Sequence, residues 1–540
     1  RQKQNDSADY FLGGRDATWL AIGASIFASN IGSEHLIGLA GAGASSGMAM
    51  AHWEIQGWMI LILGWVFVPF YTRSMVYTMP EFLERRYNPQ SRTILSVISL
   101  VSYVLTKVAV TVYAGGLVFQ QVFGIKELWG IDFFWIAAIG LVVLTALYTI
   151  FGGMKSVLYT SVLQTPILLL GSLIILVLGF KELGGWDEMM RVCGAVTVND
   201  YGDTMTNLIR SNDDANFPWL GALIGSAIIG FWYWCTDQFI VQRVLSGKNE
   251  MEARRGTIFG AYLKLLPVFL FLIPGMIAFA LHQKYIGAGG EGFLPMLENG
   301  TANADAAFPT LVAKLLPAGV KGLVVCGILA ALMSSLASLF NSSAMLFTID
   351  FYKRFRPETP EKKLVGIGQV ATVVIVILGI LWIPIMRSVG DVLYTYLQDV
   401  QSVLAPGIAA AFLLGICWKR TSAQGGMWGL IAGMVIGLTR LGAKVYYSNA
   451  GEVADSTFKY LFYDMNWLFF CGWMFLFCII VVIVVSLATK APTAEKIQGL
   501  VFGTATKEQK AATRASWNHW DIIHTVIILA ITGAFYWYFW

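Results

Sequence analysis

The chain has 540 residues, of which 56% are hydrophobic and 13% charged. Such an apolar composition excludes an ordinary soluble domain, whose polar surface has to cover a hydrophobic core. The formal net charge of +4 is spread over short segments and forms no basic block, so we expect no nucleic-acid partner, and nothing points to an obligate protein partner.

Apolar stretches recur along the whole chain, and each is long enough to cross about 30 Å of hydrocarbon, which takes roughly 20 residues. About 13 membrane spans are predicted, at 17–46, 51–72, 91–121, 131–152, 157–181, 219–246, 256–283, 317–350, 364–387, 391–418, 424–447, 464–488 and 520–540. The sequence therefore predicts an all-α, polytopic, multi-pass protein of the plasma or inner cell membrane, surrounded by the lipid bilayer.

Lysine and arginine gather in alternate loops, which predicts the orientation of the spans because cytoplasmic loops carry an excess of these residues. The basic loops include Arg85 and Arg86, Arg254 and Arg255, and Lys419 and Arg420. Residues 1–16 are then a cytoplasmic N-terminal segment, 182–218 an extracellular loop and 489–519 a cytoplasmic linker. With an odd number of spans, Trp540 lies outside.

Two spans carry small and polar residues at mid-membrane depth. They read FASNIGSEHLIGLAGAGASSG at 27–47 and WYWCTDQFIVQR at 232–243. Unpaired backbone groups in hydrocarbon cost several kcal/mol, so a broken helix whose freed carbonyls bind an ion explains such a sequence.

The two interrupted spans lie about 200 residues apart, and this spacing predicts two five-span repeats, 17–181 and 219–418, the second inverted. Residues 419–540 would then add further C-terminal helices.

Ionisable side chains inside spans are candidates for function because they are costly there, although mutual pairing is their usual fate. Those in apolar surroundings are Glu34, His35, Glu54, Asp237, Lys264 and Asp399. As a set they indicate a hydrated cavity.

A neutral polyol needs polar groups for its hydroxyls and aromatic faces for its C–H surface. The candidate polar residues are Asn30, His35, Glu54, Lys264 and Gln398, and the candidate rings are Trp53, Trp232, Tyr233, Trp234 and Tyr394. The rings could equally pack against lipid or other helices. We favour packing for Trp232, because three consecutive helix positions cannot all face one cavity.

A serine-rich run, AALMSSLASLFNSS at 330–343, offers hydroxyl oxygens to a hard cation such as sodium. Ser334 and Ser335 lie one turn after Ala331. Small-residue stripes are also how membrane helices pack closely, so both interpretations stay open.

Several motifs together carry a resemblance to a known family. They are FLGGR at 11–15, GASIFASNIGSEHLIGLAGAGASSG at 23–47, VYTMPEFLERRY at 76–87, WYWCTDQFIVQR at 232–243, GAYLKLLP at 260–267, ALMSSLASLFNSSAMLFTIDFY at 331–352 and FLLGICWKR at 412–420. Through nearly its whole length the chain resembles the sodium/glucose cotransporter family of sodium:solute symporters. The family has a further helix before FLGGR, which would bring the spans to 14.

The resemblance implies a leucine-transporter-like fold of inverted repeats with broken helices, and sodium-coupled uptake of a glucose- or galactose-like hexose by alternating access. It places sodium at the carbonyls of Ala28 and Ile31 and at the helix with Ala331, Ser334 and Ser335. The sugar would contact Asn30, His35, Glu54, Lys264 and Gln398. Tyr233, with Trp234 beside it, would close the cavity toward the cytoplasm, and Trp53 and Tyr394 would form the outer gate.

Departures from the family pattern narrow these expectations. Ser161 stands where many relatives carry an aspartate, and Ala337 stands where members that couple two sodium ions carry a threonine, so we expect one sodium per solute. Gly230 and Thr395 also depart from the family pattern, and they weaken the inference that glucose is the substrate. The motif SNIGSEH is similar to the corresponding motif of inositol carriers, so myo-inositol is an alternative substrate.

The sequence bears differently on the other functional classes. A sugar sensor that transports nothing remains an alternative. A carboxylate carrier would need a cationic site to bind its anionic solute. An enzyme is not expected, because the sequence has no metal-ligand cluster, phosphate-binding loop or nucleophile motif with the required spacing.

Overall fold

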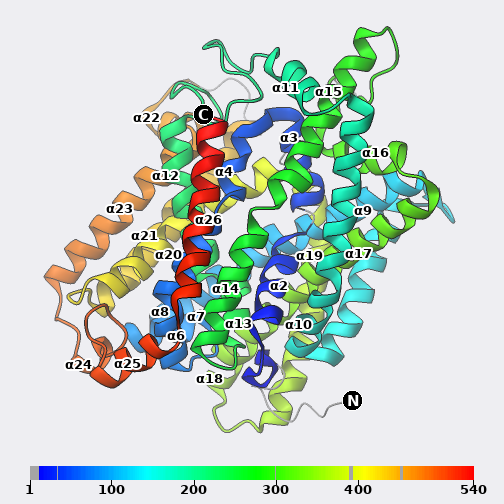
Figure 1. The fold of residues 1–540 in the computed structure, drawn as a ribbon. Helices are drawn as coiled ribbons and strands as arrows, with labels where there is room; N and C mark the ends of the chain where they lie inside the picture. Colours follow the sequence, from blue (N-terminus) through cyan, green and yellow to red (C-terminus); the bar gives the residue numbers. More distant parts are fainter. Residues whose placement is uncertain (1–10, 33, 298–299, 388–392, 450–453) are drawn as a thin grey trace.

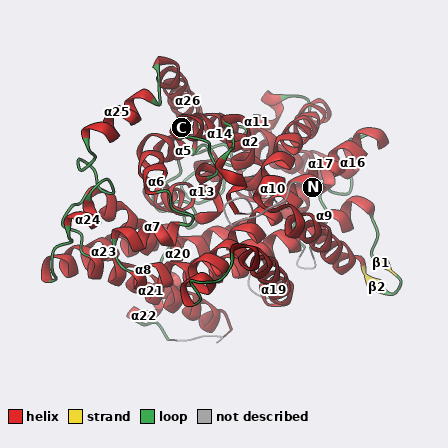
Figure 2. Ribbon diagram, turned by 90° about the horizontal axis from the view of Figure 1, so that it is seen from below, coloured by secondary structure: helices red, strands yellow, loops and turns green. Residues whose placement is uncertain are grey.

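The computed structural model describes residues 11–32, 34–297, 300–387, 393–449 and 454–540. Almost every element is helical, and the one sheet in these ranges is a two-stranded hairpin of β1 (Glu127–Leu128) and β2 (Ile131–Asp132) at the edge of the molecule (Figure 2). Twelve helical runs there are long and apolar enough to cross a membrane. The predicted all-α polytopic membrane protein is confirmed.

The first part of the chain contains the first interrupted span and the spans up to residue 194. Its elements are η1 (Gly13–Arg15), α2 (Trp19–Asn30), η2 (Glu34–Leu39), α3 (Ala40–Ser46), η3 (Gly47–Met50), α4 (Ala51–Glu54), α5 (Gly57–Ile62), η4 (Leu63–Phe67), α6 (Val68–Ser74), α7 (Met79–Arg86), α8 (Pro89–Ser102), η5 (Tyr103–Val108), α9 (Ala109–Phe123), α10 (Phe133–Leu183) and α11 (Trp186–Gly194).

The middle part contains the second interrupted span and ends at residue 417. Its elements are α12 (Trp219–Gly230), η6 (Phe231–Thr236), α13 (Gln238–Leu245), α14 (Glu250–Lys264), η7 (Val268–Leu272), α15 (Ile273–Gly287), η8 (Ala304–Ala306), α16 (Ala307–Leu315), α17 (Ala318–Met345), η9 (Leu346–Tyr352), α18 (Lys353–Phe355), α19 (Glu361–Arg387) and α20 (Leu393–Cys417).

The last part adds three long helices and short connecting ones. Its elements are α21 (Ala423–Asn449), α22 (Thr457–Lys459), η10 (Tyr460–Asp464), α23 (Trp467–Ala488), α24 (Ala494–Ile497), α25 (Lys507–Ala515) and α26 (His519–Tyr538).

The predicted spans correspond to these helices, with two differences. The first two, 17–46 and 51–72, appear as the short helix α2 followed by one apolar helical run, Glu34–Ser74. The fourth and fifth, 131–152 and 157–181, lie in a single helix, α10, without the expected loop between them.

Both predicted interruptions are present. Helix α2 ends at Asn30, and Ile31 has an extended backbone, with φ −78° and ψ 95°. In the second span Asp237, with φ −76° and ψ 127°, separates η6 from α13. A third interruption was not predicted: α14 ends at Lys264, and the chain turns through Pro267 before η7, because proline has no N–H to continue the helix.

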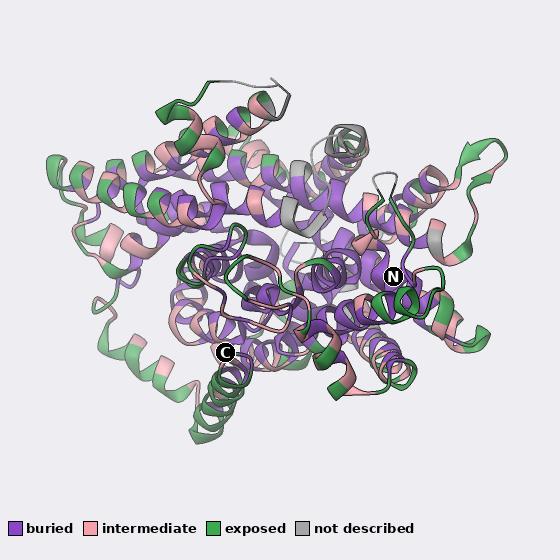
Figure 3. Cartoon of the chain, turned by 90° about the horizontal axis from the view of Figure 1, so that it is seen from above, coloured by how far each residue is buried: buried purple, intermediate pink, exposed green. Residues whose placement is uncertain are grey.

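The broken helices lie in the centre of the molecule, where α2, α13 and α14 are neighbours (Figure 1). Seen along the helices, buried residues gather in this central bundle and exposed ones on the outer helices (Figure 3). Outer residues such as Leu381 and Trp473 are large and apolar, as lipid contact requires.

Helices α2 and α26 are the first and the last long helices, and they lie near the two ends of the described chain. The beginning of α2 and the end of α26 lie at opposite faces of the bundle (Figure 1). An odd number of crossings gives this arrangement. Which face is cytoplasmic stays a prediction, as do the repeat boundaries 17–181 and 219–418.

Candidate functional site

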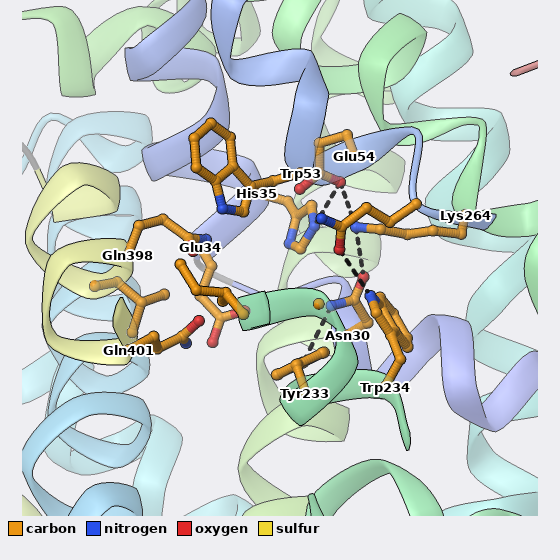
Figure 4. A pocket seen from close by; sticks show the side chains of 14 residues that line it. Asn30, Glu34, His35, Trp53, Glu54, Tyr233, Trp234, Lys264, Gln398 and Gln401 are labelled. Atoms are coloured by element: carbon orange, nitrogen blue, oxygen red, sulfur yellow. Dashed lines mark hydrogen bonds and ion pairs between the residues drawn. The ribbon is translucent and has the colours of Figure 1, made fainter. Parts of the chain in front are cut away.

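A cavity lies where the broken helices meet α4 and α20. Its lining residues are Asn30, Glu34, His35, Trp53, Glu54, Gln56, Ile229, Gly230, Tyr233, Trp234, Lys264, Leu397, Gln398 and Gln401 (Figure 4). Its volume is about 40 Å³, enough for a few water molecules at most. The side chains around it must therefore withdraw before a solute of sugar size can enter.

A buried charge cluster forms one wall of the cavity. Lys264 Nζ lies 2.6 Å from Glu54 Oε2, and His35 Nε2 lies 3.1 Å from the same oxygen. All three side chains are almost fully buried. Removing two charges from water is costly unless they pair and make further hydrogen bonds, and this cluster does both. Lys264 reaches Glu54 because it is the last residue of α14, directly before the third interruption.

Asn30 connects this cluster to the second broken helix. Lys264 Nζ donates to Asn30 Oδ1 at 3.2 Å, and Asn30 Nδ2 donates to the Tyr233 hydroxyl at 3.1 Å. Because Asn30 is the last residue of α2, its side chain lies at the end of the first half-helix. A single amide thus links the two interrupted spans and the ammonium group (Figure 4).

Three buried polar atoms around the cavity have no hydrogen-bond partner within the described ranges. They are His35 Nδ1, Trp53 Nε1 and Gln398 Oε1. Gln398 comes from α20, across the cavity from Lys264 (Figure 4). Buried polar atoms are normally paired, and an unpaired one costs about 1–3 kcal/mol. Their arrangement around one cavity indicates that a polar solute pairs them.

Aromatic residues close the cavity on opposite sides. Trp53 stacks on Trp467 with ring centroids 5.5 Å apart. Tyr233 meets Trp234 edge to face at 4.9 Å, on the other side of the cavity (Figure 4). The rings of both Trp53 and Tyr233 are buried. The side chain of Tyr394, the other predicted outer-gate residue, lies outside the described part, as do those of Thr395 and Ser161.

The first helix break contacts the serine-rich helix α17. The Ser335 hydroxyl lies 3.0 Å from the Ser29 carbonyl oxygen and 3.4 Å from that of Ile31. Ile31 is the residue whose extended backbone turns its carbonyl away from the helix axis. Carbonyl and hydroxyl oxygens are the donors a hard cation prefers.

The remaining predicted sodium ligands are buried near this contact. Ala28 is in the last turn of α2, and Ala331 and Ser334 are in α17 within about one turn of Ser335. The condition on which the sodium site depends, a broken backbone near residue 31 facing these serines, is met. The ligand assignment itself stays a prediction.

Other intramembrane charges pair away from the cavity. Asp399 pairs with Lys444, and Asp237 pairs with Lys107 at 2.5 Å. Lys107 was not among the residues predicted from the sequence, although a lysine inside the predicted span 91–121 is itself a signal of a functional or paired residue. Trp232, interpreted as a packing residue, is absent from the cavity lining, and its ring lies 5.7 Å from the Lys107 ammonium group.

Two polar cavity residues, Gln56 and Gln401, were not named from the sequence, and Glu34 was named only among the intramembrane ionisable residues. Gln401 could have been predicted from the sequence, because it follows Gln398 by three positions on a helix and so lies on the same helix face. Gln56 gave no such signal. Its side chain is held by two hydrogen bonds: Gln56 Nε2 donates to the Ser226 carbonyl oxygen at 2.8 Å, and Trp234 Nε1 donates to Gln56 Oε1 at 3.3 Å.

Comparison with known proteins agrees with this geometry. The model of the sodium:solute symporter family matches residues 10–433. The chain belongs to the sodium:solute symporter family. The resemblance seen in the sequence is confirmed: the chain is a multi-pass cell-membrane symporter, and sodium is its coupling ion.

Individual relatives within the family are similar over most of their length. The human sodium/myo-inositol cotransporter 2 is 36% identical over 517 residues, which cover 93% of this chain and 76% of the relative. The sheep (Ovis aries) sodium/glucose cotransporter 1 is 39% identical over 510 residues, covering 89% and 74%. The dog (Canis lupus familiaris) sodium/myo-inositol cotransporter is 37% identical over 525 residues, covering 93% and 72%.

A solved structure of a Na⁺-coupled sialic acid symporter, in a substrate-bound outward-open state, superposes on this symporter with a TM-score of 0.72. The two are 22% identical, with 91% of this chain and 94% of the other covered. This likeness concerns the fold, and the leucine-transporter-like fold with broken helices is confirmed.

Proposed function

We propose that this symporter couples the inward movement of one sodium ion to the uptake of a neutral polyol of hexose size, by alternating access. The observation that carries the substrate class is the set of unpaired buried groups on His35, Trp53 and Gln398. They offer both donors and acceptors to one small volume, and a polyol hydroxyl can act as either.

Charge in the cavity favours a neutral solute over a carboxylate. The ammonium group of Lys264 is already engaged by Glu54 and by the Asn30 amide. An anionic solute would need a free cation or a helix N-terminus in the same place. Glu34 adds a further acidic group to the lining, which repels an anion.

Coupling follows from the closeness of the two sites along α2. Ile31, whose carbonyl faces Ser335, directly follows Asn30, which faces the sugar cavity. A sodium ion bound at the Ile31 carbonyl would hold the end of α2 in one position and so orient Asn30. Each ligand then favours the same conformation and raises the affinity for the other. A membrane potential of about 100 mV adds roughly 2.3 kcal/mol for each sodium ion moved inward.

Myo-inositol is the second candidate substrate. Glu34, which gives the SNIGSEH run its likeness to inositol carriers, lines the cavity, where its carboxylate can accept bonds from ring hydroxyls. Relatives that bear the name of myo-inositol cotransporters and one that bears the name of a glucose cotransporter are similarly close to this chain.

The proposal is tested by uptake into proteoliposomes with an inward sodium gradient. The panel contains radiolabelled glucose, galactose, fucose and myo-inositol, and each is assayed with sodium and with potassium in its place. Sodium-dependent accumulation of at least one solute is the expected result. Binding without accumulation would mean that the protein is a sensor and that the proposal is wrong.

The cavity is tested with Gln398→Ala. The change removes one unpaired acceptor, and we expect the affinity for the solute to fall by about 1–3 kcal/mol. Gln424→Ala is the matched control, because Gln424 is exposed at the beginning of α21. Equal affinities of the two variants would show that the solute binds elsewhere.

A further inference from the structure

A second cavity, unlike the first, is almost wholly apolar. It is a groove of about 270 Å³ between the C-terminal helix α26 and the region around the third interruption. Its lining residues are Ile55, Trp186, Leu265, Phe269, Ile531, Thr532, Phe535, Tyr538 and Phe539. Its single aliphatic hydroxyl, that of Thr532, is satisfied within its own helix by the Ile528 carbonyl oxygen at 3.0 Å. An apolar cavity of roughly 150 Å³ is already enough to hold benzene and exclude water.

The groove is open toward the outside of the bundle and closed toward its centre. On the rim, Phe269, Ile531 and Tyr538 are 38%, 44% and 58% exposed, whereas on the floor Ile55 and Leu265 are 2% and 7% exposed. The rest of α26 exposes further large apolar residues, among them Val526 and Leu529. The groove therefore faces the hydrocarbon of the bilayer.

Amphipathic aromatic residues lie at one end of the groove. The Trp186 indole donates to the Tyr538 hydroxyl at 3.2 Å, and Trp537 and Trp540 are strongly exposed beside them. Such rings mark the level of the lipid headgroups. A chain that enters the groove from this level runs along α26 into the hydrocarbon, which is the geometry of a phospholipid tail.

The floor of the groove is the back of the polar cavity. Ile55 stands between Glu54 and Gln56, and Leu265 directly follows Lys264; these three neighbours all line the polar cavity. The residues that line the two cavities are thus direct neighbours in sequence, just after α4 and just after α14. Helix α26 has a second connection to the same region, because the hydroxyl of Tyr536 lies 2.9 Å from Nδ1 of His52, next to Trp53.

We propose that this groove binds one acyl chain of a membrane phospholipid, and that the bound chain sets the affinity of the polar cavity for its solute. An acyl chain supports Ile55 and Leu265 from behind and thereby fixes Glu54 and Lys264 at their 2.6 Å separation. The binding of lipid stands on the groove alone, and its effect on solute affinity rests on the proposed function.

The test uses the full chain in proteoliposomes that contain phosphatidylglycerol with a diazirine at the end of one acyl chain. After illumination, labelled residues are located by mass spectrometry. We expect labelling of the groove residues to exceed that of an open lipid-facing surface such as Val370 and Leu381 of α19. Ile531→Trp, which fills the groove, should reduce groove labelling to the level of that surface. Ile527→Trp, one turn earlier and 40% exposed but outside the lining, is the matched control and should leave it unchanged.

The coupling is tested with the same two variants in sodium-driven uptake of whichever of glucose, galactose or myo-inositol the wild type accumulates. We expect Ile531→Trp to change the KM for that solute by about 5-fold or more, the lower end of typical coupling between sites, and Ile527→Trp to leave it unchanged. Ile531→Phe, a smaller replacement, serves where the tryptophan variant fails to fold. An unchanged KM together with lost labelling would overturn the coupling.

Groove labelling no higher than on α19 would overturn the lipid site, as would labelling that a sterol or a free fatty acid displaces but added phospholipid does not. A wild type that accumulates none of the three solutes would contradict the proposed function, while the labelling result would still decide the lipid site.

Discussion

The first two helix breaks differ in how the backbone groups freed by the break are satisfied. At the first, Ile31 leaves the helix and its carbonyl oxygen accepts a hydrogen bond from the Ser335 hydroxyl at 3.4 Å. At the second, the Asp237 carboxylate accepts hydrogen bonds from the Phe239 N–H group and the Tyr103 hydroxyl and pairs with Lys107. The second break is therefore satisfied by the protein itself, whereas the first leaves oxygen atoms that a cation can use.

The difference indicates which break changes during transport. The ammonium group of Lys107 is surrounded by the rings of Tyr233 and Phe239, at 4.6 Å and 4.3 Å, and its charge is neutralised by Asp237. Such a break needs no ligand to be stable. Near the first break, the cations Lys264 and Arg243 donate to the side chains of Asn30 and Ser29. The Ile31 carbonyl oxygen accepts from a neutral hydroxyl, that of Ser335, so this oxygen can also serve a bound cation, as a coupling site requires.

Lys107→Met gives the largest expected effect, because it breaks the internal compensation of the second break. The side chains of Lys107 and Asp237 are 1% and 2% exposed, so the variant leaves an uncompensated buried charge. The cost should be about 3–5 kcal/mol of folding stability. Thermal unfolding in detergent measures it, and transport should be lost.

The double variant Lys107→Met with Asp237→Asn is the control for that prediction. It removes both charges and should regain most of the stability, since replacing a buried pair by neutral residues is often tolerated. A single variant as stable as the wild type would show that the pair does not hold the second break.

Ser335→Ala tests the first break and should have a smaller effect. The fold should persist, because within the described residues the hydroxyl donates to two backbone carbonyl oxygens, those of Ser29 and Ile31. The sodium concentration for half-maximal uptake should rise in proportion to a loss of about 1–3 kcal/mol. Ser343→Ala, in the same helix and without a hydrogen-bond partner within the described ranges, is the control. If both variants keep the sodium dependence of the wild type, the cation binds elsewhere.

Tyr233→Phe tests the link between the breaks and should have the smallest effect. It removes the hydroxyl that accepts from the Asn30 amide at 3.1 Å but keeps the ring that closes the cavity. A neutral hydrogen bond contributes about 0.5–1.5 kcal/mol, so the KM for the solute should rise several-fold while the sodium dependence changes little. A loss of sodium dependence instead would mean that Tyr233 positions the cation site through Asn30.

Many residues of the site could be predicted because placing a polar or charged side chain inside a membrane span costs free energy. A glutamate, a lysine or an asparagine inside an apolar span needs a reason, and Glu54, Lys264 and Asn30 do line one cavity. Lys107 followed the same rule and was overlooked. Gln56 could not be assigned to the cavity from the sequence, because a side chain near a helix break has no fixed face until the break is folded.

What the sequence alone determined is the membrane environment, the order of most spans and the positions of the first two breaks. Each of these depends on the local cost of placing a residue type in hydrocarbon. The tertiary structure decided which groups meet: Glu54 with Lys264, Asp237 with Lys107, and Ile31 with Ser335, pairs separated by between 130 and 304 positions. It also decided that an apolar groove lies directly behind a polar cavity, because packing between distant helices follows from their shapes and has no counterpart in local sequence.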